Sequence, residues 1–316
     1  MARILVTGAS GLLGANFVLT ATEEHEVVAV CHRERIERPD LDVIQADLSH
    51  PGVAREVVAS RRVQWVIHCA AATDVDACEL DPAGAFRLNR DMARQVAEAA
   101  RAEGAGLVHI STDAVFDGEA GPYREEDEAR PVNVYGRSKL EGERAVLAAH
   151  PEALVVRTNI YGWNALPKRS LAEWFLERLE QGQRTPGFTD VWVTPILVSD
   201  LARLILSMIV GGLRGLYHVA GAECVSKYDF GRAVAQVFGL EPGLIYPARV
   251  GEAGLRAPRA LRLCLNGSKV ERDLDVRLPG VVQGLKLMRG ERDQGRLAEL
   301  KKMALTTVAS GKGADR

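Results

Sequence analysis

The stretch Ile4-Leu5-Val6-Thr7-Gly8-Ala9-Ser10-Gly11-Leu12-Leu13-Gly14 decides the fold of this chain. It starts as a short apolar run and continues into glycines spaced three residues apart, where a helical pattern begins. Glycines at such a turn permit a tight bend, a close backbone approach to a pyrophosphate, and close packing of helix on strand. The N–H groups that open the helix add an anion site. We therefore predict that a dinucleotide contacts Gly8, Ser10, Gly11, Leu12, Leu13 and Gly14.

Strands and helices alternate through the first half of the chain. The predicted strands are 4–6, 27–30, 43–45, 65–68, 107–110 and 154–156. The predicted helices between them are 12–20, 53–60, 82–102 and 134–148. Strict alternation implies right-handed crossovers, and hence an α/β fold with a doubly wound parallel sheet of the Rossmann type.

The pattern changes after residue 159. Helices are predicted at 171–180, 200–210 and 227–238, separated by loops that contain glycine and proline. We expect an NADP-binding domain with the catalytic residues over 1–158. A smaller, mostly helical substrate-binding part should cover 159–305 and return chain to the main sheet. The small and polar residues over 306–316 predict a flexible tail.

The composition is that of an ordinary globular protein. The chain has 316 residues, 47% apolar and 26% charged, with a formal net charge of −2. This charge gives no reason to expect nucleic acid or an anionic membrane as a partner. The longest apolar stretch, 204–210, is far too short to span a bilayer. The N-terminus does not resemble a signal peptide, and we expect a cytoplasmic protein.

The cysteines Cys31, Cys69, Cys78, Cys224 and Cys264 are scattered, odd in number and form no CxxC pair. They predict neither a disulfide framework nor a zinc site, and they favour a reducing compartment. The carboxylates over 73–79 are interpreted as part of a solvated loop rather than as a metal site. No metal is expected.

We expect the segment after the second strand, Cys31-His32-Arg33, to bind the cofactor's 2′-phosphate. An acidic residue there accepts the ribose hydroxyl of NAD, whereas an arginine can bind the phosphate of NADP. Arg33 therefore favours NADPH, with NADH as the alternative. On the competing interpretation, Arg33 is one of several solvated arginines, with Arg35 and Arg38.

Other residues are placed along the predicted cofactor path. Asp47 and Leu48 follow the third strand, where they can touch the adenine, although Asp47 could instead cap the next helix. Ala70, Ala71 and Ala72 follow the fourth strand and let a flat cofactor lie against the backbone, or simply serve packing. Asn89 either links towards the active site or is an ordinary polar helix residue.

The most specific signal is Tyr135-Gly136-Arg137-Ser138-Lys139. Tyrosine and lysine four residues apart share one helix face. We expect the Lys139 ammonium to stabilise the phenolate form of Tyr135 and to bind the nicotinamide ribose. Thr112, at the end of the fifth strand, can hydrogen-bond a substrate carbonyl. These three residues predict hydride transfer with proton exchange by the phenol.

The chain resembles the dTDP-4-dehydrorhamnose reductase family of extended short-chain dehydrogenases. The similarity is clearest in three segments, 110–118, 121–125 and 133–143, and weaker similarity reaches about Met288. The resemblance implies Thr112, Tyr135 and Lys139 as the catalytic triad, NADPH as the hydride donor and a 4-keto-6-deoxy sugar nucleotide as the substrate. It suggests dTDP-rhamnose biosynthesis as the setting. The substrate-binding candidates are Thr73, Val75, Asp113, Asn159, Trp192 and Thr194.

Two departures from the family pattern fall in the substrate-binding half. Asn159-Ile160 stands where the family usually has serine and tryptophan, and 193–196 replaces a Gly-x-Pro-Thr loop. Two alternatives therefore stay open. One is an epimerase or dehydratase of the same fold. The other is a non-catalytic NADP-binding subunit, since the chain also resembles the regulatory β subunit of methionine adenosyltransferase. A homodimer is a further expectation.

Overall fold

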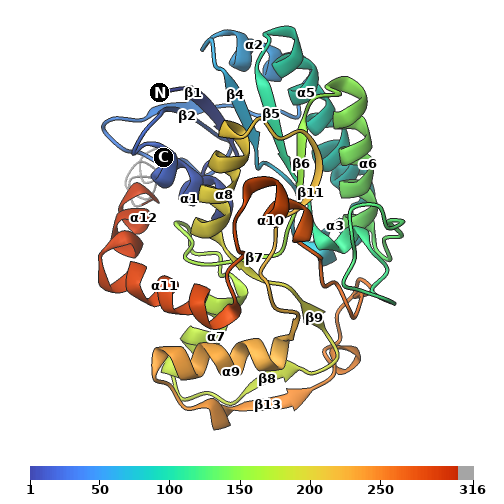
Figure 1. Cartoon of the computed structure of the whole chain (residues 1–316), viewed down its shortest axis with the longest axis vertical. Coiled ribbons are helices and arrows are strands. Elements are labelled where there is room, and N and C mark those ends of the chain that lie inside the picture. The colour runs from blue at the N-terminus through green and yellow to red at the C-terminus, as the bar shows by residue number, and fades with distance from the viewer. Residues whose placement is uncertain (305–316) are drawn as a thin grey trace, which may run out of the picture.

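A seven-stranded parallel sheet forms the centre of the protein, which is described here from a computed structural model covering residues 1–304 (Figure 1). The sheet order is β11-β6-β5-β4-β1-β2-β3. The strands are β1 (Arg3–Thr7), β2 (Glu26–Cys31), β3 (Asp42–Gln45), β4 (Trp65–His68), β5 (Gly106–Ile110), β6 (Leu154–Arg157) and β11 (Gly215–His218). All six predicted strands are present, and the predicted fold class is confirmed. The order reverses between β1 and β4, which opens a crevice at the carboxyl edge where dinucleotides bind in such sheets.

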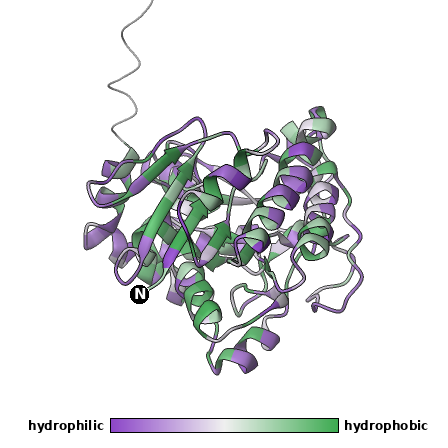
Figure 2. Cartoon of the chain, turned by 90° about the horizontal axis from the view of Figure 1, so that it is seen from above, coloured by the Kyte–Doolittle hydropathy of each residue, from purple (hydrophilic) through white to green (hydrophobic). Residues whose placement is uncertain are grey.

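Helices cover both faces of the sheet. On one face α1 (Leu12–Ala21) packs against α8 (Val198–Val210) over a core that includes Ile67 and Val108. On the other face lie α2 (Val53–Ala59), α5 (Met92–Ala102) and α6 (Val134–Ala149), over Leu5, Val66 and Leu107. Figure 2 shows the apolar strands between these helices. The runs of β-branched residues are therefore buried on both sides, as a parallel sheet requires.

The helix predicted over 82–102 consists of three pieces. They are α4 (Pro82–Phe86), a π-helical turn η1 (Arg87–Asp91) and α5. The loop expected over 73–79 is wrong, because most of it is helix α3 (Val75–Leu80). Its N-cap is Asp74, whose side chain accepts the Ala77 N–H at 2.9 Å. A carboxylate at this position satisfies a free N–H and favours the helix dipole.

The second half is more β-rich than expected. The predicted helices are present as α7 (Leu171–Glu180), α8 and α9 (Lys227–Phe238). Three two-stranded sheets join them, β7 with β10 (Ile160–Tyr161, Ile196–Leu197), β9 with β12 (Trp192–Val193, Val225–Ser226) and β8 with β13 (Thr185–Phe188, Ile245–Ala248). Most of these strands have only two residues, too few to show a period of two. In Figure 1, β8 and β13 lie beside α7 and α9 at the end far from α2.

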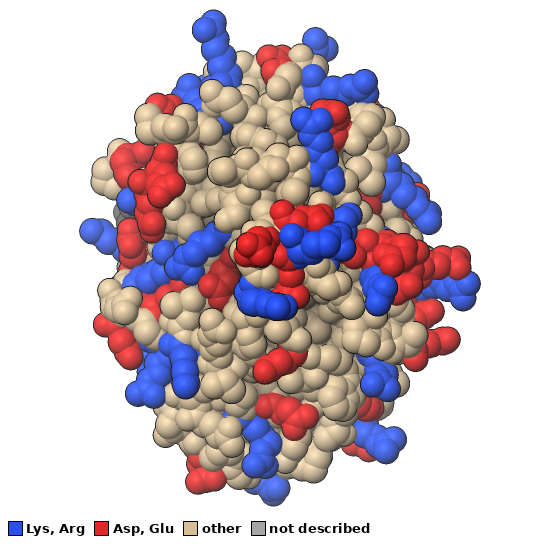
Figure 3. Space-filling model, viewed as in Figure 1, with Lys and Arg blue, Asp and Glu red and all other residues tan. Residues whose placement is uncertain are grey.

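Three more helices complete the described chain. They are α10 (Ser268–Leu274), α11 (Val281–Asp293) and α12 (Arg296–Ala304). The predicted tail over 306–316 lies outside the described residues. Within 1–304 no helix has the length and apolar character needed to cross a bilayer, and no group of His, Cys, Asp and Glu could hold a metal ion. On the face in Figure 3, basic and acidic side chains lie among one another rather than in a patch of one sign.

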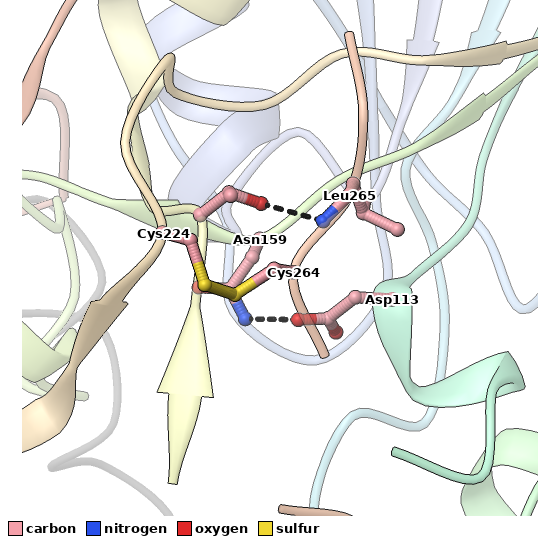
Figure 4. The surroundings of a disulfide bond; sticks show 6 residues. Asp113, Asn159, Cys224, Cys264 and Leu265 are labelled. Atoms are coloured by element: carbon pink, nitrogen blue, oxygen red, sulfur yellow. Dashed lines mark hydrogen bonds between the residues drawn. A yellow bond between two sulfur atoms is a disulfide. The ribbon is translucent and has the colours of Figure 1, made fainter. Parts of the chain in front are cut away.

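A disulfide corrects the cysteine prediction. Cys224 and Cys264 are bonded, with their Cα atoms 5.5 Å apart (Figure 4). The pair joins the loop before β12 to the segment before α10. The spacing of these cysteines carried no sign of the pairing, because the two residues are 40 apart in the chain and meet only through the fold.

Reduction of this disulfide should lower the free energy of unfolding by about 2–4 kcal/mol, because it releases a long closed loop in the unfolded chain. The measurement is urea unfolding with and without a dithiol reductant. A Cys224→Ser/Cys264→Ser double variant is the control and should not respond to the reductant. A wild type whose unfolding midpoint does not move would contradict the prediction.

Candidate active site

The three predicted catalytic residues meet at the carboxyl end of β5. Tyr135 and Lys139 lie one turn apart on α6. The Thr112 hydroxyl lies close enough to the Tyr135 phenol to affect its pKa. The Lys139 ammonium donates to the carbonyl oxygen of Ile110 at 2.6 Å. The arrangement gives an oriented acid, a hydroxyl beside it, and a buried cation one turn away.

The start of α6 places this group. The Asn133 side chain caps the helix by accepting the Gly136 N–H at 2.9 Å. A Cβ on Gly136 would lie 2.1 Å from the Ala114 carbonyl oxygen. Only glycine lets the first turn of α6 press against the chain that follows Thr112, and this close approach brings Tyr135 to Thr112.

Burial is the largest influence on the pKa values of Tyr135 and Lys139. It raises the pKa of Tyr135 to about 12, although the neighbouring Thr112 hydroxyl acts in the opposite direction. It lowers the pKa of Lys139 to about 8, against the attraction of Glu143. Burial, together with the charge of Asp113, disfavours the phenolate, so the expected stabilisation of that form by Lys139 does not set the pKa of Tyr135. Tyr135 is therefore a protonated acid at neutral pH.

Asn89 links towards the active site, which was one of its two interpretations. Its amide accepts the Ala72 N–H at 2.8 Å and donates to the Ala72 carbonyl at 3.0 Å. It also donates to the Ser138 hydroxyl at 2.9 Å. A Cβ on Gly142 would lie 2.1 Å from the Asn89 carbonyl oxygen, so α6 also touches the π-helical turn closely. The chain after β4 is thereby fixed to α6.

The glycine turn has the form that a dinucleotide requires. Gly8 has φ of +64°, and a Cβ there would lie 2.7 Å from the Ala70 backbone nitrogen. A Cβ on Gly14 would lie 2.2 Å from the Gly8 carbonyl oxygen. Helix α1 starts after Gly11, where no side chain caps the helix. Its first N–H groups are therefore free to bind a pyrophosphate, and the turn fits the cofactor.

Arg33, in the segment after β2, is available to bind a phosphate. Its side chain is exposed, and no carboxylate of the described chain forms an ion pair with it. Asp47 lies beside His32, with their side-chain atoms 3.5 Å apart. It also accepts the Ser49 N–H at 3.0 Å, so it stabilises its own turn rather than capping a helix. Leu48 is buried.

Asp113 is a buried carboxylate next to Thr112. It accepts from Thr112 at 3.0 Å and from the Asn159 amide at 2.6 Å (Figure 4). Burial raises its pKa to about 6, although both hydrogen bonds and the charge of Lys227 act against this. Asn159 therefore takes part in the site, at the position where the chain departs from the family pattern.

The structure does not bring every substrate candidate to Tyr135. The buried Thr194 hydroxyl accepts the Leu265 N–H at 3.1 Å, and so holds backbone. Trp192 lines a separate cavity of about 620 Å³, where Arg262 lies over its ring. Thr73 accepts from Lys168 at 3.0 Å. Val75 opens α3.

Lys227 is a site residue that the sequence analysis missed. It begins α9, is half-buried, and lies near Asp113 and Arg259. It also lines a cavity of about 500 Å³ together with Arg169, Trp174, Phe188 and others. Burial lowers its pKa, although Asp113 attracts the proton. A lysine at the start of a helix looks like a solvated residue in sequence, and only the fold reveals its burial.

The fold and this constellation define an NAD(P)-dependent oxidoreductase of the extended short-chain type. The chain belongs to the RmlD substrate binding domain family, whose model matches residues 2–291. This confirms the resemblance seen in the sequence.

Three curated relatives illustrate the range of the family. The probable low-salt glycan biosynthesis reductase Agl14 of Haloferax volcanii is 36% identical over 281 residues, covering 87% of this chain and 93% of that protein. A dTDP-4-dehydrorhamnose reductase of Mycobacterium tuberculosis is 37% identical, covering 82% and 83%. Methionine adenosyltransferase 2 subunit beta of Bos taurus is 32% identical, covering 83% and 80%.

A solved structure agrees with these relatives. The dTDP-4-dehydrorhamnose reductase of Bacillus anthracis, in complex with NADP, superposes with a TM-score of 0.79. The two chains are 28% identical, and the match covers 92% of this chain and 99% of the other.

Proposed function

We propose that this protein is an NADPH-dependent reductase of a 4-keto sugar nucleotide, most like dTDP-4-dehydrorhamnose reductase. The observation that carries the proposal is the contact of Thr112 with Tyr135, one helical turn from the buried Lys139. The reductase relatives and the NADP complex of the structural neighbour support it.

The catalytic residues have distinct roles in reduction. Thr112 orients the substrate carbonyl, and Tyr135 donates its phenolic proton to the carbonyl oxygen. A pKa of about 12 keeps that proton in place at neutral pH, which suits the reducing direction. Lys139 holds the nicotinamide ribose. NADPH, when bound, supplies the hydride that completes the new alcohol.

The cofactor residues are assigned from the crevice between β1 and β4. The turn over 8–14 and the first N–H groups of α1 would hold the pyrophosphate. Ala70, Ala71 and Ala72, fixed by Asn89, would line the nicotinamide side. Arg33 would bind the 2′-phosphate, with Asp47 and Leu48 beside the adenine.

The substrate side is assigned from Asp113 and Lys227. A sugar nucleotide carries a diphosphate, and Lys227 and Arg259 are cations that lie close to one another there. The neighbouring cavity of about 500 Å³ has aromatic walls in Trp174 and Phe188, which suit a nucleoside. Asp113 and Asn159 would contact the sugar near the reacting carbon.

The direct test is NADPH oxidation by the purified protein against a panel of keto sugar nucleotides. Turnover of a 4-keto compound is the expected result. Tightly bound NAD that is retained through purification would instead favour an epimerase or dehydratase. NADPH binding without turnover of any compound would favour a non-catalytic subunit.

Arg33→Ala should weaken NADPH binding by about ten-fold or more and leave NADH binding nearly unchanged. A charge-assisted hydrogen bond to phosphate contributes roughly 1.5–3 kcal/mol, and exposure to water and salt brings the effect towards the lower value. Dissociation constants for both cofactors decide the matter, with Arg55→Ala on α2 as a control. An unchanged NADPH-to-NADH ratio would refute the assignment.

Lys227→Met should raise KM for the sugar nucleotide by about ten-fold or more, because it removes a half-buried cation from the proposed diphosphate site. The Kd for NADPH should stay within about two-fold, since Lys227 faces the other side of the site. Both constants are measured on one preparation, with the exposed Lys286→Met as a control. Loss of NADPH binding would show that the two halves do not divide the ligands in this way.

A further inference from the structure

A buried ion pair joins helix α6 to strand β6. Glu143, one turn after Lys139 on α6, is paired with Arg157 at the end of β6, and both side chains are only 5% exposed. The Arg157 guanidinium donates to the carboxylate twice, at 2.9 and 2.7 Å. The Ser111 hydroxyl donates to the same carboxylate. Glu143, Arg157 and Ser111 have no role in the reduction proposed for this site.

Two hydrogen bonds link α6 to the chain at the end of β5, and Glu143 accepts the second of them. The first is the bond from Lys139 to the Ile110 carbonyl. The second is the bond from Ser111 to Glu143. The next residue in the chain is Thr112, which contacts Tyr135. The position of the substrate-facing hydroxyl is thus set by two successive residues that are both fixed to α6.

Phe116 and His218 also contact the Arg157 guanidinium. Its guanidinium lies 5.0 Å from the centre of the Phe116 ring. One of its nitrogens lies 3.5 Å from His218 Nε2, while His218 Nδ1 lies 3.0 Å from the Tyr123 carbonyl oxygen. Burial and Arg157 lower the pKa of His218 to about 3. A neutral ring with its proton on Nδ1 donates to the carbonyl and accepts from Arg157, which fits both contacts.

Glu143 is the main anionic neighbour of Lys139. Burial lowers the pKa of Lys139, and the attraction of Glu143 opposes this more than that of Cys69. His68 and His109 lie stacked on the neighbouring strands β4 and β5, 5.4 Å apart. Burial and then Lys139 lower the pKa of both rings, so they are neutral and add no charge.

We propose that Glu143 is a positioning residue of this active site. Through Ser111 it fixes Thr112 against Tyr135, and its charge holds the Lys139 ammonium ready for the cofactor ribose. The proposal rests on the proposed use of NADPH, but it concerns residues that touch neither cofactor nor substrate.

The test is NADPH binding by fluorescence titration between about pH 6 and about pH 9.5. In the wild type, affinity should fall as pH rises through about 8, because Lys139 loses its proton there. In E143Q the midpoint should move down by roughly 0.5–1 pH unit, since an attracting charge is gone. With the sugar substrate at pH 7, kcat should fall about ten-fold. The exposed Glu141, which pairs with Arg144 on the same helix, gives the matched control E141Q.

Two further variants separate position from charge. S111A keeps every charge but releases Thr112, so kcat should fall by about three-fold or more while the pH midpoint stays that of the wild type. E143D keeps the charge and loses reach, and should behave similarly, which also covers an E143Q that fails to fold. A midpoint that moves in E143D, or that stays fixed in E143Q, overturns the proposal. A wild type that does not bind NADPH overturns the proposed function instead.

Discussion

Replacing Tyr135 by phenylalanine should lower kcat by about 10²–10⁴-fold, the usual contribution of a positioned acid or base. The phenol lies beside Thr112, and its raised pKa keeps it protonated. Phenylalanine has nearly the same shape and fills the same space, so α6 should keep its contact with the chain after β5. The loss should therefore appear in the chemical step.

The binding of NADPH separates this result from a folding defect. Because the Tyr135 hydroxyl serves the substrate, the Kd for NADPH should change by less than about three-fold. Tyr246→Phe, at an exposed position on β13, is the matched control and should retain full activity. Turnover by Tyr135→Phe within a few-fold of the wild type would remove Tyr135 from the mechanism.

The first half of the fold was predictable because its signals are local. Most strands are short apolar runs, and each is separated from the next by a helical stretch or a loop, so the pattern does not depend on a distant partner. The glycine turn was also predictable, since the spacing of Gly8, Gly11 and Gly14 records a steric need that the structure shows directly. The π-helical turn at Asn89 was not, because it depends on a close contact with Gly142 on another helix.

The proximity of the proposed catalytic residues was predictable for the same reason, whereas the contacts of the substrate candidates were not. Tyr135 and Lys139 share one helix, and their spacing alone places them together. Thr194 belongs to a candidate loop, but its hydroxyl is used by Leu265, a residue 71 positions away. Lys227 reaches the site only through the packing of α9. The disulfide likewise depends on contacts that no local pattern encodes.

Some expectations stay predictions. The division into a part that binds cofactor and a part that binds substrate needs the ligand measurements above. The homodimer needs a measured mass in solution.

Replacing Lys139 by methionine should lower kcat/KM by about 10²–10⁴-fold and, unlike Tyr135→Phe, should also weaken NADPH binding by at least about ten-fold. The ammonium is buried, and within residues 1–304 its one hydrogen-bond acceptor is the Ile110 carbonyl, so its other N–H groups are available for the ribose. Each such charge-assisted bond contributes roughly 1.5–3 kcal/mol.

The pH profile gives this prediction its sharpest test. Burial lowers the pKa of Lys139 to about 8, so the ammonium is present below that pH and is lost as pH rises through it. NADPH affinity of the wild type should therefore fall above about pH 8, and the variant should have a flat profile. Methionine has a similar length and carries no charge, so the cost of burying an ammonium disappears and the variant should be at least as stable as the wild type. Lys286→Met on α11 is the control. A variant that keeps the alkaline fall in affinity would show that another group titrates, and Lys139 would lose its assigned role.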